Sequence, residues 1–304
     1  MTNGTDRLLE KRWGVFNHFL YGEPGGTLAE EQKGTDWNAR VNAVNVEKIA
    51  SQLHEMGAGY YFITLMQGRQ YMLAPNQTYD TIAGAAPGEL CAERDLVMEL
   101  SDALSRYDID LCLYYTGDGP YKDAAVGGKF GFIEPRGQVS VDFVSRWASV
   151  LREYSVRYGD RVTAWWVDGC YDYFGYDDAL LGLYYEAVKA GNPAAVAALN
   201  NGVKQDLYKW YVGAELTPGE YNDFTVIPEG RWVDGAQVQI LAPLGLSADG
   251  NLGGWGRPGA KRDHAYMKEY IRKVNEKGGI VTVDIAIGPD GSFDPQQMKV
   301  LTGV

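Results

Sequence analysis

The chain has 304 residues, of which 45% are hydrophobic and 22% charged. These are ordinary values for a globular protein, and they exclude a disordered, collagenous or coiled-coil chain. Acidic residues outnumber basic ones by 40 to 28, which gives a net charge of −12. Such a chain repels phosphate backbones and anionic lipid surfaces, so we expect no nucleic-acid partner and no membrane partner.

Cysteine usage and the N-terminus bear on the cellular compartment. Cys91, Cys112 and Cys170 are odd in number and lack C-x-x-C spacing, which fits neither a disulfide framework nor a zinc site. The first residues contain no apolar segment typical of a signal peptide, and no window reaches the roughly 18 apolar residues of a membrane span. We therefore expect a cytoplasmic protein, with removal of an export signal from the sequence as the alternative.

Short apolar runs alternate with helical patterns along the chain. The runs that we expect to form strands are residues 13–19, 59–66, 109–115, 162–167, 196–200, 210–214, 237–241 and 280–287. Helical periodicity covers residues 46–56, 94–107, 141–158, 179–190 and 264–277. Nearly continuous apolar strands separated by helices indicate a parallel sheet covered on both faces.

Eight such strands over this length predict an α/β protein, a (β/α)8 TIM-like barrel that forms a single catalytic domain over residues 1–304. An open doubly wound sheet is the alternative. Its dinucleotide-binding version has no support, because no G-x-G-x-x-G motif follows the first expected strand.

In a barrel the reacting groups stand where the strands end, so the polar residues that follow the apolar runs are the candidates for chemistry. Asp168 directly follows the run Ala164–Val167, although an Asp before a Gly is as often a turn or capping residue. Glu215 ends the run 210–214 and could equally be a solvated loop charge. Further polar residues follow other runs: His18, Gln67, Arg69, Tyr114, Tyr115, Asp118, Asn200 and Asn201.

Two carboxylates from different strands are what glycoside hydrolysis requires, one to act on the anomeric carbon and one to exchange a proton. Aromatic residues make up 12% of the chain, and sugar rings stack on aromatic faces, although a large core also uses them. Trp166, beside Asp168, and Trp255, in the Gly-rich segment 251–259, are the candidates for such stacking. Metal-ligand spacing, a G-x-S-x-G motif and a P-loop are absent from the sequence, so we expect no metal and no cofactor.

Several blocks in order resemble the catalytic domain of the glycoside hydrolase family 29 α-L-fucosidases. WGVFNHFLYG (13–22) is similar to the family's FGIFIHWG segment, and ERDLVMELSDALSRYDIDLCLYYT (93–116) to KRDIVKELVDACRKEGLKFGLYYS. WWVDG (165–169) resembles WFDG, and WYVGAE (210–215) resembles RWVGNE. The segment GGIVTVDIAIGPDGSFDPQQMKVL (278–301) is similar to the family's closing strand and the residues directly after that strand.

The resemblance implies a retaining exo-glycosidase that acts on a terminal α-L-fucosyl or related sugar through a covalent glycosyl-enzyme, without cofactor or metal. Asp168 becomes the nucleophile and Glu215 the acid/base, while His18 and Tyr115 become substrate contacts. The partner is then an oligosaccharide or another glycoside. Glu220 lies five residues after Glu215, and the acid/base assignment stays open between them.

The chain departs from the family where KHHDGF is replaced by LMQGRQY (65–71). Gln67 and Gly68 stand at or near the positions of the paired histidines, so the identity of the sugar stays undetermined. Gln67 and Arg69 can still bind hydroxyl groups. The chain also ends without the β-sandwich common in the family, which makes a homo-oligomer conceivable. A glycosidase for another sugar, a catalytically silent glycan-binding barrel and a metal-dependent barrel enzyme are the alternatives.

Overall fold

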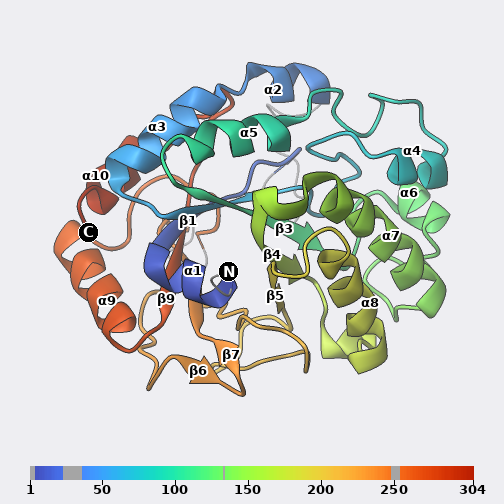
Figure 1. The fold of residues 1–304 in the computed structure, drawn as a ribbon. Coiled ribbons are helices and arrows are strands. Elements are labelled where there is room, and N and C mark those ends of the chain that lie inside the picture. The colour runs from blue at the N-terminus through green and yellow to red at the C-terminus, as the bar shows by residue number, and fades with distance from the viewer. Residues whose placement is uncertain (1–3, 23–35, 133, 248–253) are drawn as a thin grey trace.

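The computed structural model describes residues 4–22, 36–132, 134–247 and 254–304. The strands are β1 (Trp13–Asn17), β2 (Tyr60–Thr64), β3 (Asp110–Thr116), β4 (Val162–Asp168), β5 (Val196–Leu199), β6 (Trp232–Val233), β7 (Ala236–Gln237), β8 (Gln239–Pro243) and β9 (Ile280–Ile285). The α-helices are α1 (Gly4–Lys11), α2 (Trp37–Ala43), α3 (Val46–Met56), α4 (Gln77–Ala83), α5 (Leu96–Ser105), α6 (Ala124–Lys129), α7 (Val141–Tyr158), α8 (Asp178–Lys189), α9 (His264–Glu276) and α10 (Pro295–Leu301). Figure 1 shows the longer helices surrounding the strands.

Seven strands form one curled sheet in the order β5-β4-β3-β2-β1-β9-β8, and every neighbouring pair is parallel. Strands β6 and β7 form a separate two-stranded antiparallel ribbon. The order follows the chain from β1 to β5 and returns through β9 and β8, which is the winding of a TIM-like barrel. The expected α/β class is therefore confirmed.

The alternation of side chains along each strand divides the buried residues into an inner and an outer core. Tyr114 and Trp166 belong to the inner core enclosed by the sheet, and their rings stack at 5.6 Å. Their neighbours Tyr115 and Trp165 point to the outer core, between the sheet and the helices. This alternation decides which side of each strand can reach the inside of the barrel.

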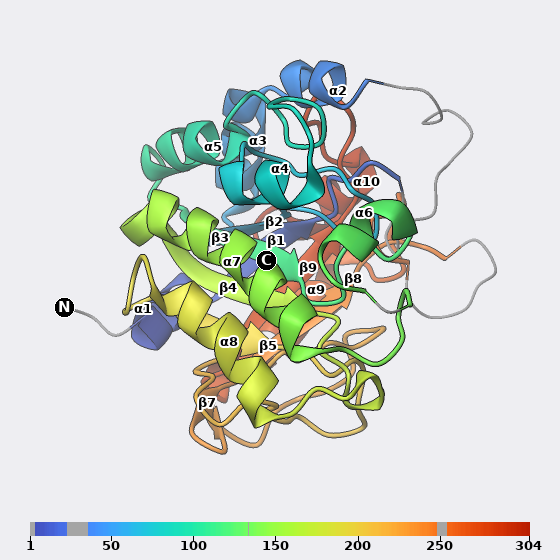
Figure 2. The ribbon, with the colours of Figure 1, turned by 90° about the vertical axis from the view of Figure 1, so that its right-hand side faces the viewer.

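The helices begin and end where local sequence dictates. Asn45 and Ser140 accept hydrogen bonds from backbone amides in the first turns of α3 and α7, which satisfies donors that a helix leaves unpaired. Gly57 ends α3 in the left-handed conformation. Helices α3, α5, α7, α8 and α9 lie outside the sheet (Figures 1 and 2). Each buries an apolar face. Among the described residues no helix is long and apolar enough to cross a membrane.

The prediction of a sixth strand at residues 210–214 is wrong, because these residues form turns. The described residues therefore show a seven-stranded curled sheet and not a closed eight-stranded barrel. The segment 215–221 lies between β5 and β8 instead. Leu216 donates its amide to Ala197 of β5, and Tyr221 donates to Leu241 of β8. The physical reason is local: Pro218 has no amide to donate and Gly219 is left-handed, so a regular ladder cannot continue through this segment.

Candidate active site

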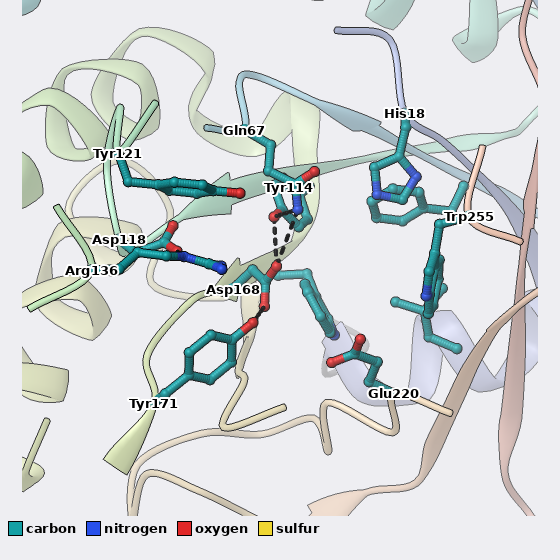
Figure 3. Close-up of a pocket in the computed structure, with 13 residues that line it drawn as sticks. His18, Gln67, Tyr114, Asp118, Tyr121, Arg136, Asp168, Tyr171, Glu220 and Trp255 are labelled. Carbon is teal, nitrogen blue, oxygen red and sulfur yellow. Dashed lines mark hydrogen bonds and ion pairs between the residues drawn. The ribbon is translucent and has the colours of Figure 1, made fainter. Parts of the chain in front are cut away.

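The barrel opens into a cavity of about 290 Å3 at the end where the parallel strands finish (Figure 3). Its volume lies near the lower limit of about 300–1,000 Å3 for small-molecule sites, which suits one or two sugar rings. The lining residues are Phe16, His18, Gln67, Tyr114, Asp118, Tyr121, Arg136, Trp166, Asp168, Tyr171, Glu220, Leu241 and Trp255.

Asp168 is the last residue of β4, and its carboxylate is held from two sides. The hydroxyl of Tyr114 donates to Oδ2 at 2.7 Å, and the amide of Gln67 reaches both that hydroxyl, at 2.7 Å, and Oδ2, at 3.4 Å. On the other side, Oδ1 accepts from Asn200 Nδ2 at 2.8 Å and from the Tyr171 hydroxyl at 3.5 Å. These donors orient the carboxylate and stabilise its negative charge.

Glu220 is another carboxylate among the lining residues, beside Asp168 and Asp118. Gly219 positions it: with a φ of 57°, Gly219 packs so closely on β8 that an added Cβ would lie 1.8 Å from the carbonyl oxygen of Gln239. Trp166 donates its indole N–H to the carbonyl of Pro218 at 3.1 Å, which ties the same segment to β4. The pKa of Glu220 is raised to about 7, first by burial and then by the negative charge of Asp168, while the hydrogen bond from Asn200 lowers it.

Asn200 connects the two carboxylates. Its Nδ2 donates to Asp168 Oδ1 at 2.8 Å and to Glu220 Oε2 at 2.7 Å. Its Oδ1 accepts from the Gly202 amide at 3.1 Å and the Tyr208 hydroxyl at 2.9 Å, which fixes the orientation of the side-chain amide. Because both carboxylate oxygens bond one nitrogen atom, they cannot be farther apart than these two distances combined, about 5.5 Å.

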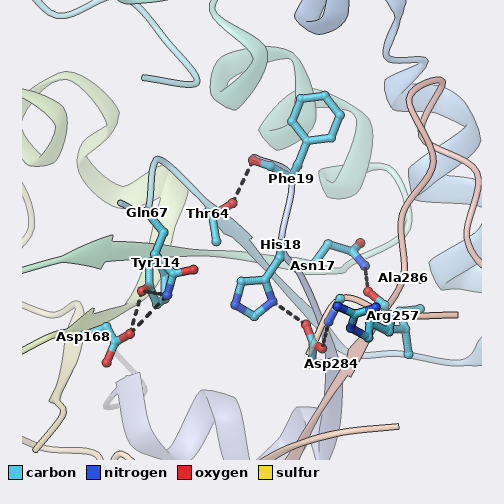
Figure 4. A network of polar contacts seen from close by, with 12 residues as sticks. Asn17, His18, Phe19, Thr64, Gln67, Tyr114, Asp168, Arg257, Asp284 and Ala286 are labelled. Atoms are coloured by element: carbon cyan, nitrogen blue, oxygen red, sulfur yellow. Dashed lines mark hydrogen bonds and ion pairs between the residues drawn. The ribbon is translucent and has the colours of Figure 1, made fainter. Parts of the chain in front are cut away.

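His18 forms the opposite wall with Trp255, whose ring lies edge-on at 5.9 Å. Nδ1 of His18 lies 2.7 Å from Asp284 Oδ1 (Figure 4). Asp284 Oδ2 accepts from the Gly256 amide at 2.6 Å. Asp284 is fully buried at the end of β9. Since Nδ1 is engaged by Asp284, Nε2 remains for a ligand in the cavity.

The structure brings five of the eight expected site residues to the cavity: Asp168, His18, Gln67, Trp166 and Trp255. Glu215 lies elsewhere, because its carboxylate accepts from Tyr185 at 2.7 Å and from the Ala197 amide at 3.1 Å, and pairs with Lys189 at 2.6 Å. Tyr115 points outward and donates to the carbonyl of Trp147 at 2.9 Å. Arg69 is not among the lining residues and pairs with Asp123 at 3.1 Å.

Several lining residues follow from signals in the sequence, and others do not. Tyr114 and Asp118 stand at the end of the third apolar run, and alternation makes Tyr114, rather than Tyr115, the inward residue. Asn200 ends the fifth apolar run, but nothing in the sequence indicates that its side chain bonds both carboxylates. Tyr121, Arg136 and Tyr171 come from loops after β3 and β4, whose course no periodicity predicts.

No protein-family model and no curated protein matches the sequence. The endo-fucoidan hydrolase MfFcnA9 from glycoside hydrolase family 107 is similar in structure, with a TM-score of 0.73 and 15% identity over 99% of this chain and 63% of that chain. The α-L-fucosidase GH29 from Bacteroides thetaiotaomicron has a TM-score of 0.67 and 17% identity, over 99% of this chain and 72% of that chain.

A GH29 α-L-fucosidase from Bacteroides thetaiotaomicron trapped as a covalent intermediate with 2-fluoro-fucosyl fluoride has a TM-score of 0.65 and 15% identity, over 99% of this chain and 74% of that chain. The chain thus spans less than two thirds of the length of MfFcnA9. At these identities the similarity shows the fold, which this chain shares with glycoside hydrolases of families 107 and 29.

Proposed function

We propose that the protein is a retaining exo-glycosidase of the α-L-fucosidase type, which hydrolyses a terminal α-L-fucosyl or configurationally related sugar through a covalent glycosyl-enzyme. The observation that carries the proposal is the pair Asp168 and Glu220, joined by one amide group in the cavity. The fold shared with fucosidases and fucoidan hydrolases supports the same chemistry.

The separation of the carboxylates favours retention over inversion. Retaining glycosidases keep their two carboxyl groups about 5–5.5 Å apart, whereas inverting enzymes leave about 6.5–9.5 Å for a water molecule. The limit of about 5.5 Å that Asn200 sets on the nearest oxygens agrees with retention. The covalent intermediate trapped in the similar fucosidase adds support.

In the first step Asp168 attacks the anomeric carbon, and the bond to the leaving oxygen breaks as Glu220 gives that oxygen its proton. In the second step Glu220 takes a proton from water, the water oxygen bonds the anomeric carbon, and Asp168 is released. We assign the acid/base role to Glu220 rather than Glu215, because Glu220 lines the cavity and its pKa of about 7 keeps it protonated near neutrality.

A glycosidase for another sugar is the second candidate, and Gln67 favours it. Its amide is engaged with Tyr114 and Asp168, so it presents a different set of donors from the paired histidines of the fucosidases. A catalytically silent glycan-binding barrel is the third candidate. Against it stand the two linked carboxylates, which sugar binding alone does not require.

Initial rates on chromogenic glycosides test these candidates. The panel is α-L-fucoside, α-L-arabinoside, α-L-rhamnoside, α- and β-D-galactoside and β-D-xyloside, each with the wild type and with Asp168→Asn. We expect turnover of the α-L-fucoside that collapses in the variant. If another glycoside alone is turned over, its sugar replaces α-L-fucose in the proposed activity. Glycan binding without any hydrolysis would favour the catalytically silent barrel.

A further inference from the structure

A second group of side chains lines the cavity on the side of Asp168 away from His18 and Trp255. In Figure 3 Tyr121, Asp118, Arg136 and Tyr171 lie together on that side. They come from the loops that follow β3 and β4. The two-step reaction described above gives none of these four side chains a role, apart from the contact of Tyr171 with Asp168.

Arg136 is the centre of this group, and its guanidinium is held in place. Nε and Nη2 donate to Asp118 Oδ2 at 3.1 and 3.0 Å, and the Thr116 hydroxyl donates to the other oxygen of Asp118. The guanidinium carbon lies 4.1 Å from the centroid of the Tyr121 ring. Arg136 itself has a φ of 55°, a conformation that costs free energy in a residue other than glycine.

The exposure of single side chains indicates that the cavity opens on the side of Arg136. The Arg136 side chain is 45% exposed, although its partner Asp118 is only 4% exposed. On the opposite side the His18 side chain is 6% exposed and Asp284 is fully buried. Beyond the open end, Tyr171 stacks at 5.1 Å on Tyr173, which is 62% exposed. An exo-acting enzyme holds the terminal sugar at the closed end, so the rest of its substrate leaves through the open end.

We propose that Arg136, Tyr121 and Tyr171 form a subsite for the leaving group of the substrate, and that this leaving group is an uncharged sugar. The inference rests on the proposed glycosidase function. A guanidinium has five N–H donors, and Asp118 engages only two of its nitrogen atoms, so donors remain for sugar hydroxyl groups.

Charge selects an uncharged sugar over an acidic one. The positive charge of Arg136 is matched by Asp118, and the same cavity contains the carboxylate of the nucleophile Asp168. A carboxylate or sulfate on the leaving group would therefore meet an excess of negative charge. Hydroxyl groups accept hydrogen bonds from Arg136 without that repulsion.

The test compares three α-L-fucosides: the 4-nitrophenyl glycoside, fucosyl-galactose and fucosyl-galacturonic acid of the same linkage. Arg136→Gln should lower kcat/KM on fucosyl-galactose about 10- to 100-fold more than on the nitrophenyl glycoside, as expected for lost hydrogen bonds from a charged donor to sugar hydroxyl groups. The wild type should prefer the galactose compound to the uronic acid by at least about tenfold.

Arg146→Gln is the matched control, because Arg146 is 47% exposed and pairs with Asp142 on α7 at 3.0 Å. If Arg136→Gln does not fold, Arg136→Lys keeps a positive charge beside Asp118 but loses the planar fork, and the same selective loss is expected. An equal loss on all three substrates, or a preference for the uronic acid, would overturn the subsite. Absence of wild-type turnover on all glycosides of the panel would instead remove the proposed function itself.

Discussion

At the scale of single residues, the site depends on how two carboxylates are kept close while their charges repel. Asn200 continues the pairing of β5 with β4, since its amide donates to the carbonyl of Val167 at 2.8 Å. The side-chain amide is thereby brought beside Asp168, with one N–H for each carboxylate. We infer that Asn200 sets the spacing of the carboxylates, and its hydrogen bond lowers the pKa of Glu220.

Asn200→Ala should remove this link between the two carboxylates. We expect kcat on an aryl glycoside to fall about 10- to 100-fold, because two hydrogen bonds to charged groups are lost where the geometry matters most. The basic limb of the pH–rate profile should also move to higher pH, because the hydrogen bond from Asn200 lowers the pKa of Glu220 and its loss raises that pKa. Asn201→Ala is the control, because Asn201 bonds Asp172 instead. An unchanged profile would contradict this positioning role.

The choice between Glu220 and Glu215 is also a question for single residues. Glu220→Gln should lower kcat/KM about 10²- to 10⁴-fold for glycosides with poor leaving groups, which is the usual contribution of a general acid. Substrates that need no protonation, such as a dinitrophenyl glycoside, should lose less in the first step. Wild-type activity should decline as the pH rises through about 7, where Glu220 loses its proton.

Glu215→Gln is the matched variant for that experiment. Because Glu215 bonds Lys189, Tyr185 and the start of β5, its replacement should act on stability and leave the rate on folded enzyme within a few-fold of the wild type. The reverse ranking of the two variants would restore Glu215 as the acid.

At the scale of elements, hydrophobic periodicity predicts the regular strands and helices but not the irregular segments between them. The runs that became β1 to β5, β8 and β9 are apolar because both faces of the sheet are buried, so their existence is readable from the sequence. The segment 215–221, between β5 and β8, forms no regular strand, and the close approach of Gly219 to β8 places Glu220 there. A backbone contact of that kind leaves no periodic signal, whereas Glu215 directly follows the expected strand 210–214 and lies in the block WYVGAE, so the sequence favours Glu215.

Gly219→Ala tests whether that close approach positions Glu220. The added methyl group would lie 1.8 Å from the carbonyl oxygen of Gln239, so the segment must move away from β8. We expect a loss of stability on the order of 2 kcal/mol or more, together with a large loss of activity. Gly235→Ala is the matched control: its φ is 78°, but an added Cβ would meet nothing within 4 Å. Equal effects of both variants would mean that φ alone matters.

At the scale of the whole molecule, the net charge of −12 and the carboxylates of the cavity both lower the stability of the folded state when the acidic groups are ionised. Burying carboxylates near one another costs stability whenever they are ionised. The pKa of Asp118 is raised to about 6, chiefly by burial and against the effect of Arg136, and the pKa of Glu220 to about 7. The catalytic geometry is therefore linked to the free energy of unfolding through pH.

The sign of this link can be worked out for Glu220. In the unfolded chain its pKa is near 4.5, and in the folded protein about 7. Below pH 4.5 both states are protonated, so the group costs nothing. Between these values the unfolded chain releases the proton that the folded protein keeps, and stability falls as the pH rises, by on the order of 3 kcal/mol in total.

Glu220→Gln removes this titration, so the variant should gain a few degrees in Tm relative to the wild type between pH 4.5 and pH 8. Asp118 titrates in both proteins and cancels from the difference. Thermal unfolding followed by circular dichroism across that range measures it. Glu215→Gln, which breaks an ion pair with Lys189, should show no such gain. A difference in Tm that is the same at both pH values would mean that Glu220 ionises as freely in the folded protein as in the unfolded chain, and the acid/base assignment would lose its physical basis.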